Sequence, residues 1–495
     1  MQETKIKSLL QESLKEKELK VYSQQYEIPA LSCAVFPIKS SCRFFLGVWQ
    51  RERSPLFEKP LFTLQDLGKK VFLLIYPFSW ENYLLLAQYL PYLRPAPFDD
   101  CLSFGCGDRL GMVSAAHLRA LKKFPVFPVI AQQSPRELER THRTFKDVLL
   151  GAAWGVLESG YRSPFGADAD HVKEEKHLLE ARDLGYTMYT LDLSDEVDYG
   201  VFSLSEKELL QRFENLDAKS REIFNLYRGK EWKLSPEVMI DFSEGKLLPI
   251  LLAYLPAIDR VEYFHALLSE SVSSFDLEIS LDEGPRETSP EAHFFVAEEL
   301  HRRKIDFHSL APRFPGLFEK GVEYVGDLEE LALSFRIHSI IQRNLTGYRL
   351  SLHSGSDKFS VYPSFFQETG GILHVKTSGT SWLSALEVIV ESTPDLFRAI
   401  YKIAYQTLED NLKAYSLSLD KADFPADLEK VDDRDLLGFF FQDKVRQMLH
   451  IAYGPILEAF GDRLREVLFA QEEKHYEKVS NNIEKHLSVL FGRDK

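Results

Sequence analysis

The segment SPFGADADHVK, residues 163–173, ends a strand-like run of small and apolar residues with two aspartates and a histidine. Asp168, Asp170 and His171 are costly to bury unless they are paired, hydrogen-bonded or bound to a metal ion. Asp170 could instead cap the helical pattern that follows it. The segment therefore predicts either a helix cap or part of a polar site.

Two further histidines occupy the same kind of position. His353 begins HSGSDKF (353–359), and His374 lies in LHVKTSGTS (373–381). One histidine on a strand is usually a hydrogen-bonded structural residue, but three at strand ends indicate a shared site. Imidazoles with a carboxylate suit a borderline divalent ion such as Zn²⁺, Mn²⁺, Co²⁺ or Ni²⁺. We predict that His171, His353 and His374 hold one divalent ion, whose open position polarises a substrate oxygen.

Basic residues near the strand ends could bind an anionic group of the substrate. A guanidinium binds a carboxylate in a bidentate manner, which favours Arg313 over the lysines. Each lysine taken alone could equally be a solvated surface residue. The predicted substrate-binding residues are Arg109, Lys173, Arg313, Lys358 and Lys376.

The segment SFGCGDRLGMVSAAHLRAL (103–121) resembles a dinucleotide-binding turn, because glycines fall between a strand-like run and a helical pattern. Its spacing is GxGxxxG and not GxGxxG. The next strand-like run ends VIAQQS, without an acidic residue for a ribose hydroxyl. We therefore expect no nicotinamide, and a turn that presents Asp108 or Arg109 to a ligand.

The elements that carry these residues alternate between strand-like runs and amphipathic helical patterns, which predicts parallel strands with right-handed crossovers. Eight runs is the count of a TIM (β/α)8 barrel, whose active sites lie at the carboxyl ends of the strands. A doubly wound sheet is the competing architecture. The runs span residues 101–105, 126–131, 164–170, 186–193, 275–281, 304–311, 348–354 and 372–377.

The predicted α/β fold has three parts. Residues 1–95 form an N-terminal α/β segment that packs on the barrel, with a charged amphipathic helix at its start, short strands at RFFLGVWQ (43–50) and KKVFLLIYP (69–77), and an aromatic-rich helix after them. Residues 96–392 form the barrel, interrupted by a helical insertion at about 194–270, and residues 393–495 form a helical extension. The barrel thus carries extra helical segments on both its N-terminal and C-terminal sides.

The composition argues against several classes of partner. Hydrophobic residues make up 44% of the 495 residues, and the net charge is −15 without a Lys/Arg-rich block. We therefore expect a small-molecule substrate, and neither nucleic acid nor a membrane as partner. No signal peptide or membrane-spanning run is evident and the four cysteines form no CxxC pair, which predicts a cytoplasmic protein. The sequence leaves the oligomeric state open, a homo-oligomer included.

Several unusual strings between about residues 100 and 390 together resemble the tagaturonate epimerase family of bacterial hexuronate catabolism. The resemblance implies a divalent-metal-dependent enzyme that interconverts D-tagaturonate and D-fructuronate. Close relatives are similar to 4-epimerases of tagatose and fructose. The strings are FGCGDRLG (104–111), AQQSPRELERT (131–141), WGVLESGYRSPFGADADHVK (154–173), LAPRFPGLFEKGVEYVGD (310–327), HSGSDKFSVYPS (353–364) and HVKTSGTSWLSAL (374–386).

The resemblance also implies roles for individual residues. Asp170 and Glu278 match the acid–base pair, and the three strand-end histidines match the metal ligands. The sequence departs from the family pattern at Ser384, where an acidic residue is expected, and at residues 284–286. These departures bear on the choice of substrate more than on metal binding.

The two ketouronates differ at a carbon one removed from the α position of the ketone, so simple enolisation cannot invert it. Transient oxidation would need a nicotinamide, whereas retro-aldol cleavage and rejoining needs a metal ion and two carboxylates. We therefore expect the retro-aldol route. An aldolase or sugar isomerase on the same barrel is one alternative, and a non-catalytic sugar-acid-binding protein is another.

Overall fold

The computed structural model describes residues 18–41, 43–51, 57, 59–66, 71–98, 102–415 and 417–493. The helix expected at the start of the chain falls mainly on residues 1–17, which lie outside the described residues. Among the described helices, none combines the length and the apolarity that a bilayer crossing requires.

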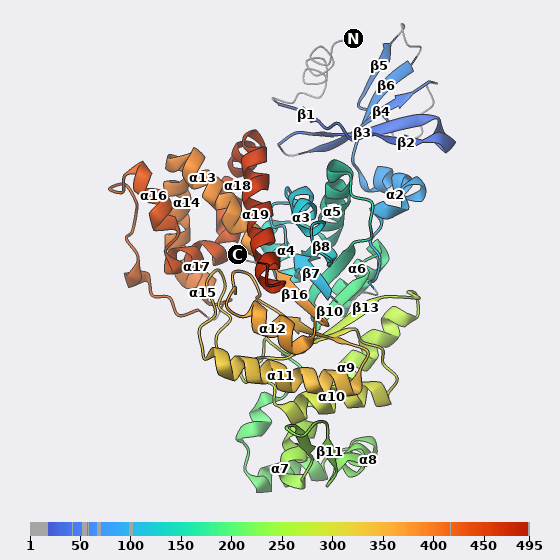
Figure 1. Ribbon diagram of the computed structural model, residues 1–495, viewed down its shortest axis with the longest axis vertical. Coiled ribbons are helices and arrows are strands. Elements are labelled where there is room, and N and C mark those ends of the chain that lie inside the picture. The colour runs from blue at the N-terminus through green and yellow to red at the C-terminus, as the bar shows by residue number, and fades with distance from the viewer. Residues whose placement is uncertain are drawn as a thin grey trace.

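Eight parallel strands close into a barrel at the centre of the molecule (Figure 1). Each strand-like run identified in the sequence forms one barrel strand, which confirms the predicted TIM-type barrel over an open doubly wound sheet. In order around the ring the strands are β7 (Leu102–Cys106), β8 (Phe127–Gln133), β9 (Gly166–Val172), β10 (Met188–Asp192), β13 (Asp276–Ser280), β14 (Ser309–Ala311), β15 (Arg349–Leu352) and β16 (Leu373–Thr377).

Helices follow most strands and cover the outside of the barrel, as right-handed crossovers require. Capping residues fix several of their starts; Ser134 and Thr144, for example, each form a capping box. These helices are α3 (Ser114–Leu121), α4 (Pro135–Thr141), α5 (Phe145–Ser159), α6 (Glu175–Leu184), α10 (Pro290–Arg302), α11 (Leu328–Leu345), α12 (Tyr362–Thr369) and α13 (Thr380–Ser392).

The inside of the barrel is unusually polar. Side chains bond to one another from strand to strand: Ser103 to His374, Thr190 to Asp168, and Ser309 to Glu278. The usual barrel interior consists of branched apolar residues. Here a buried apolar cluster occupies only the amino ends of the strands and consists of Phe98, Phe127, Val129 and Met188. The polar interior extends from there to the opposite, carboxyl-terminal end.

The insertion between β10 and β13 is mostly helical, as predicted, and extends away from the barrel (Figure 1). It also contains a two-stranded antiparallel hairpin that the sequence reasoning missed. Its elements are η3 (Tyr199–Ser203), α7 (Glu206–Glu214), α8 (Ala218–Tyr227), β11 (Glu231–Lys233), β12 (Met239–Asp241) and α9 (Glu244–Ser269).

The N-terminal part is mainly an antiparallel sheet, and the two short strands expected from the sequence correspond to its strands β4 and β6. Its strands are nearly continuous apolar runs because both faces are covered, by the main core and by a smaller apolar cluster. The elements are β1 (Lys20–Val21), β2 (Tyr26–Ile28), η1 (Pro29–Leu31), β3 (Cys33–Lys39), β4 (Phe44–Gln50), β5 (Phe62–Asp66), β6 (Val71–Pro77), α2 (Trp80–Tyr89) and η2 (Pro91–Leu93).

The C-terminal extension is helical, as predicted, and forms a second hydrophobic core together with α3 and α13. The last helix, α19, packs against α3, α12 and α13 (Figure 1). The elements are α14 (Pro394–Gln406), α15 (Leu408–Leu412), η4 (Lys421–Asp423), α16 (Asp433–Phe440), α17 (Asp443–Ile451), α18 (Tyr453–Ala470) and α19 (Glu472–Leu490).

A buried ion cluster joins the N-terminal sheet to this last helix. Lys39, at the end of β3 and 1% exposed, places its Nζ 2.9 Å from Glu472 Oε1 and 3.6 Å from Glu158 Oε2. The same Nζ donates to the Tyr476 hydroxyl at 2.8 Å. A buried carboxylate that loses its cation keeps its full desolvation cost. The cluster therefore links strand β3 of the N-terminal sheet to helix α19.

We predict that Lys39→Met lowers the free energy of unfolding by about 3–5 kcal/mol, because Glu158 and Glu472 lose the cation they share. Lys20→Met is the matched control, since Lys20 binds the same Glu472 at 3.1 Å but its side chain is 31% exposed. Its cost should not exceed about 1 kcal/mol. Urea unfolding followed by circular dichroism measures both, and equally small losses would contradict the prediction.

Candidate active site

Two adjoining cavities open at the carboxyl ends of the barrel strands, of about 260 Å³ and about 570 Å³. The smaller is lined by Asp170, His171, Lys376 and other polar residues at the barrel mouth. Asp282, His353 and Lys320 line both cavities, and the C-terminal extension contributes Tyr415 to both. The cavities therefore lie where the barrel meets the helical extension.

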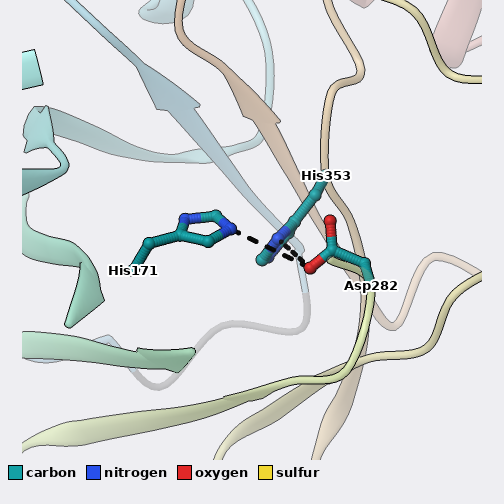
Figure 2. Close-up of side chains that lie close together, drawn as sticks. All are labelled: His171, Asp282 and His353. Atoms are coloured by element: carbon teal, nitrogen blue, oxygen red, sulfur yellow. Dashed lines mark ion pairs between the residues drawn. The ribbon is translucent and has the colours of Figure 1, made fainter. Parts of the chain in front are cut away.

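Three side chains from three strand ends converge in the smaller cavity (Figure 2). His171, Asp282 and His353 each offer one ligand atom, and these atoms lie within 4.8 Å of one another. His353 Nδ1 lies 2.9 Å from Asp282 Oδ1, and His171 Nε2 lies 3.9 Å from the same oxygen. Both ring nitrogens are buried and make no hydrogen bond to a described residue. Two imidazoles and a carboxylate arranged in this way fit a borderline divalent ion.

The opposite nitrogen of each imidazole is held by a carboxylate. His171 Nδ1 lies 2.8 Å from Asp170 Oδ1, and His353 Nε2 lies 2.6 Å from Glu278 Oε1. A carboxylate that accepts from one ring N–H fixes the ring orientation and leaves the other nitrogen as a lone-pair donor, as is common around metal ions. The two predicted catalytic carboxylates therefore also orient the two histidines.

Lys376 lies at the centre of the carboxylates. Its Nζ is 2.8 Å from Asp168 Oδ2, 2.8 Å from Asp170 Oδ1 and 2.9 Å from Glu278 Oε1, and it also contacts the Thr190 hydroxyl. Burial alone would lower the pKa of Lys376, but the three carboxylates raise it well above its usual value. The ammonium group is therefore charged and firmly held.

The carboxylates around this ammonium differ in their proton affinity. Burial raises the pKa of Asp170 and Glu278, but His171 and Lys376 acting on Asp170, and Lys376 and His353 acting on Glu278, hold both pKa values well below normal. Burial dominates at Asp168 and raises its pKa to about 6. Asp170 and Glu278 are therefore anionic at neutral pH.

A β-bulge places Asp170 and His171 on the same side of their strand. Ala169 pairs with Tyr189 and Val172 with Leu191, so two residues of β9 stand opposite Thr190 alone. His171 has a φ of 52°, in the left-handed region that non-glycine residues seldom adopt. Adjacent strand residues normally face opposite sides, and the extra residue removes that alternation. The bulge thus explains how the segment ends in two neighbouring polar groups that meet.

The structure does not bring the third predicted metal ligand to this cluster. His374 is fully buried deeper in the barrel, where its Nδ1 lies 2.8 Å from Ser103 Oγ. Burial lowers the pKa of His374 to about 3, so the ring is neutral. Asp282 takes the third position instead. It follows β13 directly and so carried the same strand-end signal as the histidines.

The predicted substrate-binding residues are placed in three ways. Arg109, Lys173 and Lys376 line the smaller cavity, and Arg313 lines the larger one. Lys358 is in neither lining; it is fully buried, and its Nζ donates to the backbone carbonyls of residues 319, 322 and 356. Lys358 therefore stabilises the loop around residue 320 from inside. The sequence did not indicate this structural role.

Barrel packing accounts for the glycine-rich turn. A Cβ on Gly105 would meet Gln132 Oε1 at 1.8 Å, and one on Gly107 would meet the Ser378 backbone at 2.8 Å. The Asp108 carboxylate accepts from the N–H groups of residues 111 and 113 and so closes the turn. Arg109 Nε donates to Glu137 Oε1 at 2.9 Å. The glycines are thus required by close contacts within the barrel.

A closed eight-stranded parallel barrel with charged residues gathered at the carboxyl ends of its strands is the architecture of an enzyme that acts on a small polar molecule. The model of the tagaturonate epimerase family matches residues 30–490, which confirms the resemblance seen in the sequence. The chain belongs to this family and is an epimerase.

Individual relatives are similar to this chain over most of its length. A tagaturonate/fructuronate epimerase from Thermotoga maritima is 45% identical over 414 residues, which cover 83% of this chain and 85% of that protein. A glycerol-complexed crystal structure of the fructuronate-tagaturonate epimerase UxaE from Cohnella laeviribosi has a TM-score of 0.89 at 33% identity and covers 99% of each chain. The native structure of that enzyme has a TM-score of 0.89 at 32% identity and covers 98% of this chain and 99% of its own.

We predict that the protein retains about one ion per chain after incubation with Mn²⁺ or Zn²⁺ and desalting, because His171, Asp282 and His353 each offer a ligand atom. His353→Ala and Asp282→Ala should lose most of this metal, because each removes one of the converging ligand atoms. His374→Ala is the matched buried-histidine control and should retain it. Elemental analysis measures all four proteins. Loss of metal in His374→Ala with retention in Asp282→Ala would restore the assignment made from the sequence.

Proposed function

We propose that this chain interconverts D-tagaturonate and D-fructuronate in hexuronate catabolism by inverting the hydroxyl-bearing carbon 4 of the ketouronate. The observation that carries the proposal is the convergence of His171, His353 and Asp282 beside Asp170, at the mouth of a barrel of the tagaturonate epimerase family. The names of the relatives from Thermotoga maritima and Cohnella laeviribosi support the choice of substrate. The neutral ketoses tagatose and fructose are the nearest alternative substrates.

We assign a divalent ion to His171, Asp282 and His353. The ion would supply Lewis-acid stabilisation of negative charge on the substrate's carbonyl and hydroxyl oxygens. Asp170 and Glu278 hold the two imidazoles in the orientation that ligation needs, and burial limits the access of water to both carboxylates. The protein thus provides a rigid set of donors before any substrate binds.

The retro-aldol route balances without a redox cofactor. A carboxylate takes the proton of the carbon-4 hydroxyl, the bond between carbons 3 and 4 breaks, and its electron pair forms an enediolate over carbons 2 and 3. Carbon 4 is then an aldehyde that turns its other face towards the enediolate. When the bond forms again, a protein acid returns the proton to the carbon-4 oxygen, with inverted configuration.

We assign the proton acceptor to Asp170, because it is the member of the predicted pair that lines the cavity. Glu278 is fully buried beneath the cavity, where it contacts Lys376 Nζ and His353 Nε2. A proton on Glu278 therefore reaches the cavity through one of these two groups. In this proposal Glu278 completes the acid–base pair through Lys376, which itself lines the cavity.

The first test is direct conversion. We predict that metal-loaded protein interconverts tagaturonate and fructuronate, loses the activity on chelation and regains it when Mn²⁺ or Zn²⁺ is returned. Chromatography measures the ratio of the two sugar acids at equilibrium, starting once from tagaturonate and once from fructuronate. An inactive protein with a full complement of metal would contradict the proposal and favour the sugar-acid-binding alternative.

The second test concerns Asp170. We predict that Asp170→Asn lowers kcat by about 10²-fold or more, the scale of lost general acid–base catalysis. Asp168→Asn is the matched control, since Asp168 contacts the same ammonium at the same 2.8 Å but does not line the cavity. Metal content is measured in both variants. Equal losses of kcat would mean that Asp170 serves only to neutralise Lys376.

The third test separates cleavage from oxidation. Because the aldehyde fragment must turn before it rejoins, we predict that an aldehyde-trapping reagent captures a small yield of three-carbon fragments during turnover. The control is the same incubation with Asp170→Asn, which should release fewer fragments in proportion to its lower kcat. Turnover that requires a stoichiometric nicotinamide would overturn the retro-aldol route, and fragments as the main product would favour an aldolase.

A further inference from the structure

A sugar acid differs from the corresponding ketose by one negative charge, so its site needs a cation that the protein has not already neutralised. Six basic side chains line the two cavities, and the ionic partners of each can be compared directly. They are Arg109, Arg136, Lys173, Arg313, Lys320 and Lys376.

Three of these cations already have carboxylate partners. Arg109 lies 2.9 Å from Glu137, Lys173 lies 2.9 Å from Asp195, and Lys376 is held by three carboxylates. Arg313 lines only the larger cavity, and its Nη1 donates to the backbone carbonyls of residues 282 and 284. The three paired side chains have little charge left for a ligand. Arg313 has no carboxylate partner among the described residues, but it does not line the smaller cavity with His171.

Lys320 differs from them because it combines partial burial with an uncompensated charge. Its Nζ donates to the neutral Ser354 hydroxyl at 2.7 Å. No carboxylate of the described residues forms an ion pair with this ammonium. An ammonium group has three donors, so two remain free to face the cavities. Ser354 is the residue next to His353, which puts this cation beside the metal-binding cluster.

The acidic neighbours of Lys320 on its own loop are engaged elsewhere. Glu319 accepts from Gln447 Nε2 at 2.6 Å and from the Ser418 hydroxyl at 3.2 Å. Glu323 accepts backbone N–H groups of residues 324 and 360. Burial lowers the pKa of Lys358 to about 8; the charge of Lys320 adds to this shift, whereas Asp357, Glu323 and Glu319 oppose it. Neither Glu319 nor Glu323 therefore pairs with the Lys320 ammonium in the described part of the chain.

Arg136 lines both cavities and, like Arg313, has no carboxylate partner in the described part of the chain. It lies on α4, is exposed, and donates weakly to a backbone carbonyl at 3.5 Å. An exposed guanidinium binds a carboxylate less strongly than a half-buried ammonium, because water screens it. The comparison therefore favours Lys320.

We propose that Lys320 binds the carboxylate of the substrate and so selects sugar acids over neutral ketoses. This inference rests on the proposed function. The ketone and the carboxylate lie towards opposite ends of the six-carbon chain. The reacting end of the substrate then lies at His171, Asp282 and His353. Its carboxylate lies near Lys320 and Tyr415, in the seam where the barrel meets the helical extension. Ser354 keeps the ammonium in place.

The test compares a charged and a neutral ligand on metal-loaded protein. In Lys320→Gln the amide can still bond Ser354, but the charge is gone. We expect KM for tagaturonate to rise about 10- to 100-fold, the scale of one charge-assisted hydrogen bond. The inhibition constant of tagatose, measured as a competitor, should change less than about threefold, since tagatose has no carboxylate to lose its partner. Lys320→Arg should recover most of the loss.

Arg136→Gln is the matched control, because it removes an unpaired cation that lines the same two cavities, and its KM for tagaturonate should change less than about threefold. An unchanged KM in Lys320→Gln, or equal weakening of tagaturonate and tagatose, would overturn the inference. A rise confined to Arg136→Gln would assign the carboxylate to α4 instead. If the wild-type protein fails to convert tagaturonate, the proposed function fails first, and the wild-type assay alone shows it.

Discussion

The charge of one buried ammonium group determines the rest of the site. Lys376 contacts three carboxylates inside a barrel whose interior is polar where barrels are usually apolar. With it in place, Asp170 and Glu278 stay anionic although they are buried. As anions, they fix the orientation of His171 and His353 and leave one nitrogen of each ring facing the cavity. The proposed metal ligation and the proposed proton transfer therefore both depend on this cation.

The site divides its tasks between two structural units. The barrel supplies the groups proposed to bind metal and move protons, and their positions are set by hydrogen bonds between neighbouring strands. The seam with the helical extension supplies the cavity wall around Lys320 and Tyr415. A change of substrate therefore requires changes in the seam, while the reacting groups stay as they are. Gly284 and Pro285, where the sequence suggested a departure from the family pattern, line the larger cavity.

The sequence predicted the eight strands because each is a short strand-like run, most are followed by a helical pattern, and such patterns are local. It predicted His171 and His353 because parallel strands bring their carboxyl ends together. The sequence could not show how deep a strand residue lies in the barrel. His374 and Lys376 both lie on β16, two residues apart. Only the strand register shows that His374 lies below the cavity and that Lys376 lines it. The bulge in β9 was equally hidden, since it breaks the alternation on which such predictions depend.

Helix α19 has a consequence for how the protein is made. It covers α3 and α13 and, through Glu472, joins a lysine more than four hundred residues earlier. A ribosome delivers the chain in order, so the apolar surfaces beneath α19 stay uncovered until α19 itself has been made. Contacts between such distant residues form slowly, and the uncovered surfaces are prone to association with other chains. A truncation or bulky tag at the C-terminus would therefore lower the yield of folded enzyme, while molecules that did fold would keep their active site.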